Sequence, residues 1–185
     1  MATEANQKEN HRNSKPSAVR RPPSALSALW KIIASGFGSG YAPLAPGTAG
    51  AMVGCLILWL LHCALPSFFF GENAWIGLAL LILIFFFLGV KSADEMEAEW
   101  GHDPAKVVVD EMVGVWIAML FVPFTFQNLL IAFVLFRIFD IWKPLGIRRM
   151  EKMKGGWGVM MDDVLAGVYA LVVLQGILFL INDLK

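Results

Sequence analysis

The sequence has few charged residues. Asp, Glu, Lys and Arg make up only 16% of its 185 residues, whereas a soluble domain typically carries about 25%. The fifteen basic and fifteen acidic side chains cancel, and no basic stripe is interleaved with aromatics, so nucleic acid is not an expected partner. Because 57% of the residues are hydrophobic, the composition instead favours an integral membrane protein.

Cysteine is also scarce. Cys55 and Cys63 lie eight residues apart in one apolar segment, without the close Cys/His spacing of a zinc site, and we interpret them as small hydrophobic residues of a helix. No clean apolar run of a secretory signal follows the first positive charges. We expect a disordered basic arm over residues 1–24, a short interfacial helix near residues 26–33, and a single membrane-embedded domain over residues 25–185.

Five apolar segments follow the arm, separated by clusters of Pro, Gly, Asn and Gln. They cover residues 49–65, 74–90, 112–124, 129–142 and 164–181. A helix needs about 17 to 25 apolar residues to cross a bilayer, so the first, second and fifth segments are long enough and the other two are short. We therefore predict an all-α, polytopic bundle of five membrane segments, in which the third and fourth form a short hairpin with both ends on one face.

Lysine and arginine are unevenly distributed between the loops. The stretch through Lys31 holds six of them, the loop over residues 91–106 holds two, and the loop over residues 143–154 holds five. The loops over residues 67–73 and 123–128 hold none. Because positively charged loops tend to stay in the cytoplasm, we predict a cytoplasmic amino terminus and an external carboxyl terminus.

On this topology, seven charged residues gather at the cytoplasmic end of the bundle, where a charge at membrane depth indicates function. They are Asp110, Glu111, Arg137, Asp140, Lys143, Asp162 and Asp163. Simpler interpretations exist for each group: the acidic pairs would suit the first turn of a helix, and Arg137 and Asp140 would suit an ion pair between helices.

The five carboxylates of this group outnumber its two cations, and a buried excess of negative charge requires a further cation. A site made only of carboxylate oxygens suits Mg²⁺, which takes one or two protein carboxylates together with water and phosphate oxygens. We therefore expect Mg²⁺ to be bound by ligands drawn from the five acids Asp110, Glu111, Asp140, Asp162 and Asp163.

A loop dense in glycine and proline, residues 36–50, precedes the first apolar segment. Its glycines would let backbone N–H groups approach an anion, and Thr48 is a candidate cap for the following helix. It is not a Walker loop, because no Gly-Lys-Ser/Thr ends it, and a simple helix breaker is the alternative. We take Gly47 and Thr48 as candidate substrate-binding residues.

Four sequence blocks together resemble the signature of the phosphatidylglycerophosphatase A family. They are GSGYAPLAPGTAG at residues 38–50, VVDEMVGVW at 108–116, FRIFDIWKP at 136–144 and GGWGVMMDDVLAG at 155–167. They occur in the family's order, and the likeness covers about residues 29–175. The amino-terminal arm lies outside it.

The resemblance implies a magnesium-dependent lipid phosphatase of the bacterial inner membrane. Such an enzyme removes the terminal phosphate of phosphatidylglycerophosphate to leave phosphatidylglycerol in phospholipid biosynthesis. The seven charged residues fall on acidic and basic positions of the family's motifs, so catalysis and metal binding go to the five carboxylates, and phosphate binding to Arg137 and Lys143. Attack by an activated water and an aspartyl-phosphate intermediate both stay open.

Other classes of membrane protein fit less well. The chain has no Asp-Gly pair, with which the motif of a CDP-alcohol phosphotransferase begins, and its three histidines form no motif of a histidine-nucleophile phosphatase. A small ion or proton transporter is the main alternative, because it would also place carboxylates in membrane segments. A transporter needs them near the midplane, whereas these cluster at one end.

Overall fold

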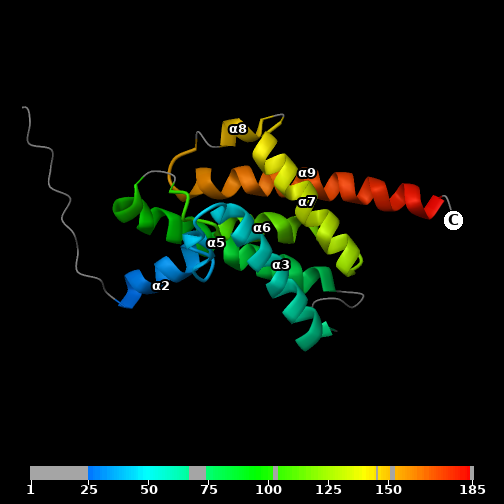
Figure 1. Cartoon of the computed structure of the whole chain (residues 1–185), viewed down its shortest axis with the longest axis horizontal. Coiled ribbons are helices and arrows are strands. Elements are labelled where there is room, and N and C mark those ends of the chain that lie inside the picture. Colours follow the sequence, from blue (N-terminus) through cyan, green and yellow to red (C-terminus); the bar gives the residue numbers. More distant parts are fainter. Residues whose placement is uncertain (1–24, 67–73, 102–103, 145, 151–152, 184–185) are drawn as a thin grey trace, which may run out of the picture.

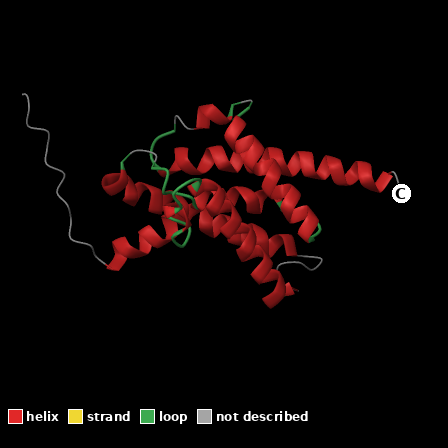
Figure 2. Cartoon of the chain, in the orientation of Figure 1, coloured by secondary structure: helices red, strands yellow, loops and turns green. Residues whose placement is uncertain are grey.

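The computed structural model describes residues 25–66, 74–101, 104–144, 146–150 and 153–183. Within these ranges it contains seven α-helices, one short 3-10 helix and no strand (Figures 1 and 2). The all-α prediction is therefore confirmed. The arm predicted over residues 1–24 lies outside the described residues.

Three of the helices are long and apolar enough to cross a membrane: α3, α5 and α9. The short α6 and α7 have 10 and 17 residues, so the count of five membrane segments stays a prediction. The elements in chain order are α2 (Ala25–Ala34), η1 (Ser39–Tyr41), α3 (Pro46–Ala64), α5 (Ala74–Trp100), α6 (Val109–Ala118), α7 (Phe126–Trp142), α8 (Ile147–Met150) and α9 (Gly156–Asp183).

Two of the long helices begin earlier than predicted. α3 starts at Pro46, since proline suits the first helical position, and Ala45 takes the cap position. Thr48 therefore lies within the first turn, and its predicted role as a cap is wrong. α9 starts at Gly156 rather than at residue 164, so Asp162 and Asp163 lie beyond its first turn. Their interpretation as first-turn acids is also wrong.

The third predicted segment is wrong at both ends. α6 begins at Val109 and stops at Ala118, although the apolar run continues to Phe124. The chain turns there because Phe121 adopts a left-handed conformation with φ of 60° and the N–H of Leu120 bonds three residues back, to Ile117. By contrast, α5 continues past the end of the second predicted segment and through the acidic residues of the stretch 94–99, and it ends at Trp100.

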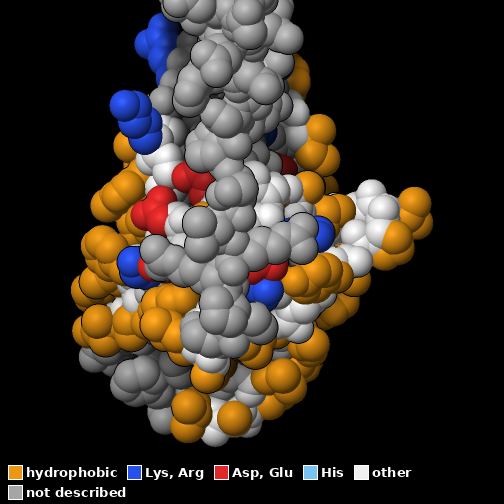
Figure 3. All heavy atoms as spheres, turned by 90° about the vertical axis from the view of Figure 1, so that its left-hand side faces the viewer, with side chains coloured by type: hydrophobic (Ala, Val, Ile, Leu, Met, Phe, Trp, Pro, Cys, Tyr) orange, Lys and Arg blue, Asp and Glu red, His pale blue; other side chains and the backbone are white. Residues whose placement is uncertain are grey.

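Large hydrophobic side chains are exposed along the long helices. Met52, Leu56 and Leu60 are 60%, 55% and 56% exposed, and their spacing of four residues places them on one stripe of α3. Such a surface suits contact with lipid. Figure 3 views the end of the molecule at the left of Figure 1 and shows charged side chains gathered there among hydrophobic ones.

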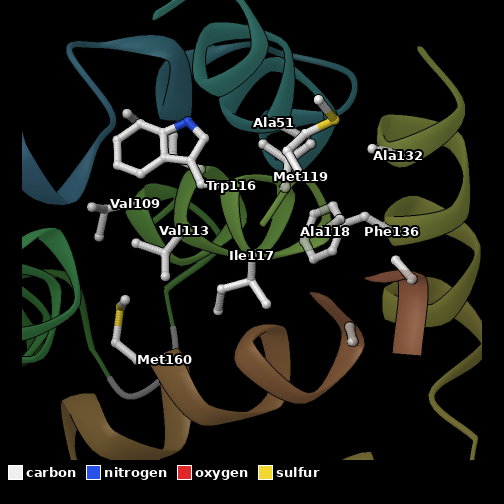
Figure 4. Close-up of a cluster of buried hydrophobic side chains, with 14 of the residues drawn as sticks. Ala51, Val109, Val113, Trp116, Ile117, Ala118, Met119, Ala132, Phe136 and Met160 are labelled. Atoms are coloured by element: carbon white, nitrogen blue, oxygen red, sulfur yellow. The ribbon is translucent and has the colours of Figure 1, made fainter. Parts of the chain in front are cut away.

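The core is built around α6, which packs against α3, α5, α7 and α9. Figure 4 shows Val113, Trp116 and Ile117 of α6 projecting toward these neighbours. Trp116 is fully buried, and its indole Nε1 donates a hydrogen bond to the Gly54 carbonyl of α3 at 2.9 Å. Because α6 is enclosed in this way, its first turn is held firmly at one end of the bundle.

Candidate active site

One cavity at this end of the bundle brings the predicted site residues together. It has a volume of about 350 Å³ and lies between the starts of α3, α6 and α9 and the end of α7. All nine predicted residues line it: Gly47, Thr48, Asp110, Glu111, Arg137, Asp140, Lys143, Asp162 and Asp163. Their individual roles remain predictions.

Three carboxylates from three helices form a candidate metal site. Glu111, Asp140 and Asp163 each offer one oxygen, and these oxygens lie within 4.8 Å of one another. Ligand oxygens of a single Mg²⁺, at about 2.1 Å in octahedral geometry, lie roughly 3 to 4 Å apart, so a small closure of side chains would complete the site. The trio could therefore hold a metal ion, and its carboxylate oxygens are the type of ligand that Mg²⁺ takes.

Arg137 lies between two members of this carboxylate trio. Its Nη1 forms ion pairs with Glu111 and with Asp140, the latter at 2.9 Å. Its Nε is buried and has no hydrogen-bond partner within the described part of the chain. Arg137 thus offsets part of the negative charge of these two carboxylates.

Lys143 pairs with the remaining acid of α9. It ends α7 in a left-handed conformation with φ of 47°, and its Nζ lies 2.8 Å from Asp162 Oδ2. Of the five carboxylates predicted as metal ligands, Asp162 is thus engaged by a lysine and Asp110 lies outside the trio, although both line the cavity. The structure thus separates the carboxylate trio from Asp110 and Asp162, a division that the spacing of these acids in the sequence did not predict.

Two acids, Asp110 and Glu111, lie in the first turn of α6, where the surroundings disfavour negative charge. This helix is not one of the three candidate membrane spans. Burial raises the pKa of Asp110 well above its usual range, and the carboxylates of Glu111 and Asp162 raise it further. Burial and the nearby Asp140 also raise the pKa of Glu111, against the opposing effect of Arg137. A bound cation would favour the ionised forms.

The start of α3 forms part of the cavity wall, beside Glu111 and Arg137. A Cβ atom at Gly47 would collide with the Glu111 carboxylate and lie 3.3 Å from Arg137 Nη1, so a larger residue here would have to displace the Glu111 side chain. Pro46 has no N–H, and the next N–H groups, of Gly47 and Thr48, have no partner within the helix because they lie in its first turn. This helix end is therefore suited to binding an anion.

Sequence reasoning missed the apolar part of the wall and one supporting acid. Met153 and Val159 line the cavity, and no charge or motif marks them. Asp94, which lies beyond the second predicted segment, accepts a hydrogen bond from the Gly156 N–H across 62 residues of sequence. The role of Asp94 becomes visible only in the structure, which places this acid of α5 next to the glycine-rich start of α9.

Comparison with known proteins agrees with the family resemblance of the four sequence blocks. A family model described as Phosphatidylglycerophosphatase A matches residues 32–178. A phosphatidylglycerophosphatase A of Escherichia coli is 35% identical over 85% of this chain and 86% of its own length. The protein of the same name from Haemophilus influenzae is 39% identical over 79% of this chain and 86% of its own length.

A protein of Bacteroides thetaiotaomicron with the provisional name phosphatidylinositol-3-phosphatase is 52% identical over 84% of this chain and 95% of its own length. No solved structure is significantly similar to the chain.

Proposed function

Because the chain belongs to the phosphatidylglycerophosphatase A family, we propose that it hydrolyses phosphatidylglycerophosphate to phosphatidylglycerol and phosphate, with Mg²⁺, in phospholipid biosynthesis. The family makes it a phosphatase, a phosphoric monoester hydrolase. Its apolar helices make it a membrane protein. We assign it to the bacterial inner membrane as a multi-pass protein, with the amino terminus and the cavity on the cytoplasmic side.

The observation that carries this proposal is the carboxylate trio of Glu111, Asp140 and Asp163 beside Arg137 in one cavity. A phosphate monoester carries nearly two negative charges, so its hydrolysis requires charge neutralisation and an oriented nucleophile. Mg²⁺ held by the trio would supply charge neutralisation and make water more acidic.

Protein groups around the trio are placed to hold the phosphate. The Arg137 guanidinium lines the cavity, and its planar set of donors suits a phosphate oxygen. Lys143 adds a second positive charge at the cavity wall. The N–H groups of Gly47 and Thr48 at the start of α3, which also lines the cavity, add further donors.

Two routes for the chemical step remain. In the first, a carboxylate outside the trio takes a proton from the attacking water while the bond between phosphorus and the lipid oxygen breaks; Asp110, which lines the cavity, is our candidate for this base. In the second, an aspartate attacks phosphorus directly, and water then hydrolyses the aspartyl-phosphate. In both routes the lipid oxygen leaves as a hydroxyl after taking up one proton: in the first from the carboxylic acid that has just accepted a proton from water, and in the second from solvent, to which the later hydrolysis returns one.

The position of the cavity suits a lipid substrate. It lies at one end of the long apolar helices rather than halfway along them. The acyl chains can therefore stay in the bilayer while only the headgroup enters. The same position argues against a transporter, in which the carboxylates would be reached from both sides of the membrane.

A phosphorylated inositol lipid is a second candidate substrate. The relative from Bacteroides thetaiotaomicron, 52% identical to this chain, is provisionally named for phosphatidylinositol 3-phosphate. Both lipids present a phosphate monoester on a polyol headgroup, so one catalytic arrangement can serve either. The headgroup alone distinguishes the two hypotheses.

One assay tests the proposal and separates the substrates. The purified chain in detergent is given phosphatidylglycerophosphate or phosphatidylinositol 3-phosphate, with Mg²⁺ or with a chelator. We expect phosphate release from phosphatidylglycerophosphate with Mg²⁺ and its loss with the chelator. A clear preference for phosphatidylinositol 3-phosphate would make that lipid the proposed substrate in place of phosphatidylglycerophosphate. No release of phosphate from either lipid would refute the proposed phosphatase reaction.

A further inference from the structure

The start of α9 is pressed directly against α5. A Cβ atom at Gly156 would lie 2.8 Å from the carbonyl carbon of Val90, so the two backbones meet where glycine leaves room. In the same turn, the ring of Trp157 contacts Phe86 of α5 edge to face, with ring centroids 5.4 Å apart. The first turn of α9 therefore makes a close and specific contact with α5.

Asp94 of α5 adds a hydrogen bond to this contact between α5 and α9. Its Oδ1 accepts a hydrogen bond from the Gly156 N–H at 2.6 Å. The first N–H groups of a helix have no partner within the helix, and a carboxylate there is favoured by both hydrogen bonding and the helix dipole. Asp94 thus caps α9 from another helix, whereas most caps come from the residue just before the helix.

The capped end of α9 leads directly to the site. Asp163 follows Gly156 by seven residues, which is about 10 Å along a helix axis. Asp163 is 3% exposed and belongs to the carboxylate trio, and the adjacent Asp162 pairs with Lys143. A shift or tilt of the helix start would therefore displace both acids together.

We propose that Asp94 is a positioning residue of this site, which holds the start of α9 on α5 so that Asp163 reaches Glu111 and Asp140. Asp94 is not among the described residues that line the cavity, so it acts through α9 and touches neither phosphate nor metal. The inference rests on the proposed function of the site.

The test compares three single variants of the full chain in lipid nanodiscs. Asp94→Ala removes the acceptor, and Asp94→Asn keeps an oxygen that can accept the same hydrogen bond. Glu95→Gln is the matched control, because Glu95 is the next residue and forms an ion pair with Lys91 on the same helix. Two properties are measured: the kinetics of phosphate release as a function of Mg²⁺, and hydrogen–deuterium exchange at the start of α9.

We expect Asp94→Ala to lower kcat roughly 10- to 100-fold, the scale of an ångström-size misplacement. It should also raise the Mg²⁺ concentration needed for half-maximal activity and speed exchange over residues 156–160. Asp94→Asn should stay within a few-fold of wild type in all three, and Glu95→Gln should match wild type. Should Asp94→Ala fail to fold, Asp94→Ser, which shortens the side chain but keeps it polar, takes its place.

Two results would overturn the inference: wild-type kinetics and Mg²⁺ dependence in Asp94→Ala, or equal losses in Asp94→Ala and Asp94→Asn. If the wild-type chain releases no phosphate from either lipid, the proposed function fails. Exchange then decides the positioning role alone: faster exchange at the start of α9 in Asp94→Ala supports it, and unchanged exchange overturns it.

Discussion

At the scale of single residues, opposite charges meet at Arg137. One nitrogen of its guanidinium contacts both Glu111 and Asp140, while its Nε faces no protein acceptor in the described part of the chain. A guanidinium presents several donors in a rigid plane, whereas the ammonium of lysine is a single point of charge on a flexible stem. The site uses the shape of Arg137 as well as its charge.

Arg137→Lys should therefore impair activity although it keeps the charge. We expect the rate of phosphate release to fall roughly 10- to 100-fold, as for the loss of one charge-stabilising donor. Arg148→Lys in α8 is the matched control, because Arg148 is exposed, and it should match wild type. Equal rates for both variants would show that charge alone suffices at Arg137.

The sequence predicted which charged residues line the cavity, but it did not predict how they pair. Arg137, Asp140 and Lys143 follow one another at intervals of three residues, which places them on one face of a helix, and the cavity includes all three. The pairing of Lys143 with Asp162 was not predictable, because it depends on the left-handed backbone of Lys143 and on the rotation of α9. Neither property follows from residue spacing.

At the scale of helices, α6 and α9 approach each other closely through glycine. A Cβ atom at Gly167 of α9 would lie only 2.5 Å from the Gly114 carbonyl oxygen of α6. Small residues at such crossings allow backbones to pack directly, which is a main source of helix association in membranes. This contact sets the distance between the helices that carry Glu111 and Asp163.

Gly167→Ala should loosen this contact. We expect a loss of about 1 to 3 kcal/mol from overpacking, seen as a lower midpoint of thermal unfolding in detergent. Gly176→Ala, in the same helix, is the control: a Cβ there would meet nothing within 4 Å, and alanine favours helix by about 0.5 to 1 kcal/mol over glycine. A midpoint for Gly167→Ala at or above that of Gly176→Ala would contradict the close packing.

Helix identity was easier to predict than helix ends. All five apolar segments contain a helix, because hydrophobic runs of this length have few other solutions. The start of α9 was missed because charge was interpreted as a boundary, whereas Asp162 and Asp163 lie within the helix and line a cavity. Burial of a charge depends on the neighbouring helices, which the local sequence does not reveal.

At the scale of the whole molecule, α7 connects two differently charged ends. Its carboxyl end reaches the cavity at Asp140, while its amino end follows a turn without lysine or arginine. The proposed orientation places the cavity end in the cytoplasm and the other end outside. Gln127 and Lys154, both exposed, mark the two ends.

Cysteine labelling in intact cells tests this orientation. With Cys55 and Cys63 replaced by alanine, Gln127→Cys should react with a membrane-impermeant maleimide added outside. Lys154→Cys should react only after the cells are permeabilised, which also serves as the control for its reactivity. The reverse pattern would place the cavity outside and contradict the proposed cytoplasmic site.

In the proposed arrangement, a membrane bundle holds buried carboxylates at the level of the lipid headgroups. Asp163 tests this most directly, because it is buried and belongs to the carboxylate trio. Asp183, at the far end of the same helix and exposed, provides the matched control.

The decisive measurement is phosphate release from phosphatidylglycerophosphate by wild type, Asp163→Asn and Asp183→Asn, each with Mg²⁺ and with a chelator. We predict metal-dependent release by wild type and Asp183→Asn, and a rate for Asp163→Asn that is lower by about 100-fold or more, as expected when charge stabilisation at the reacting centre is lost. Release that survives the chelator, or full activity in Asp163→Asn, would contradict a metal site at the trio.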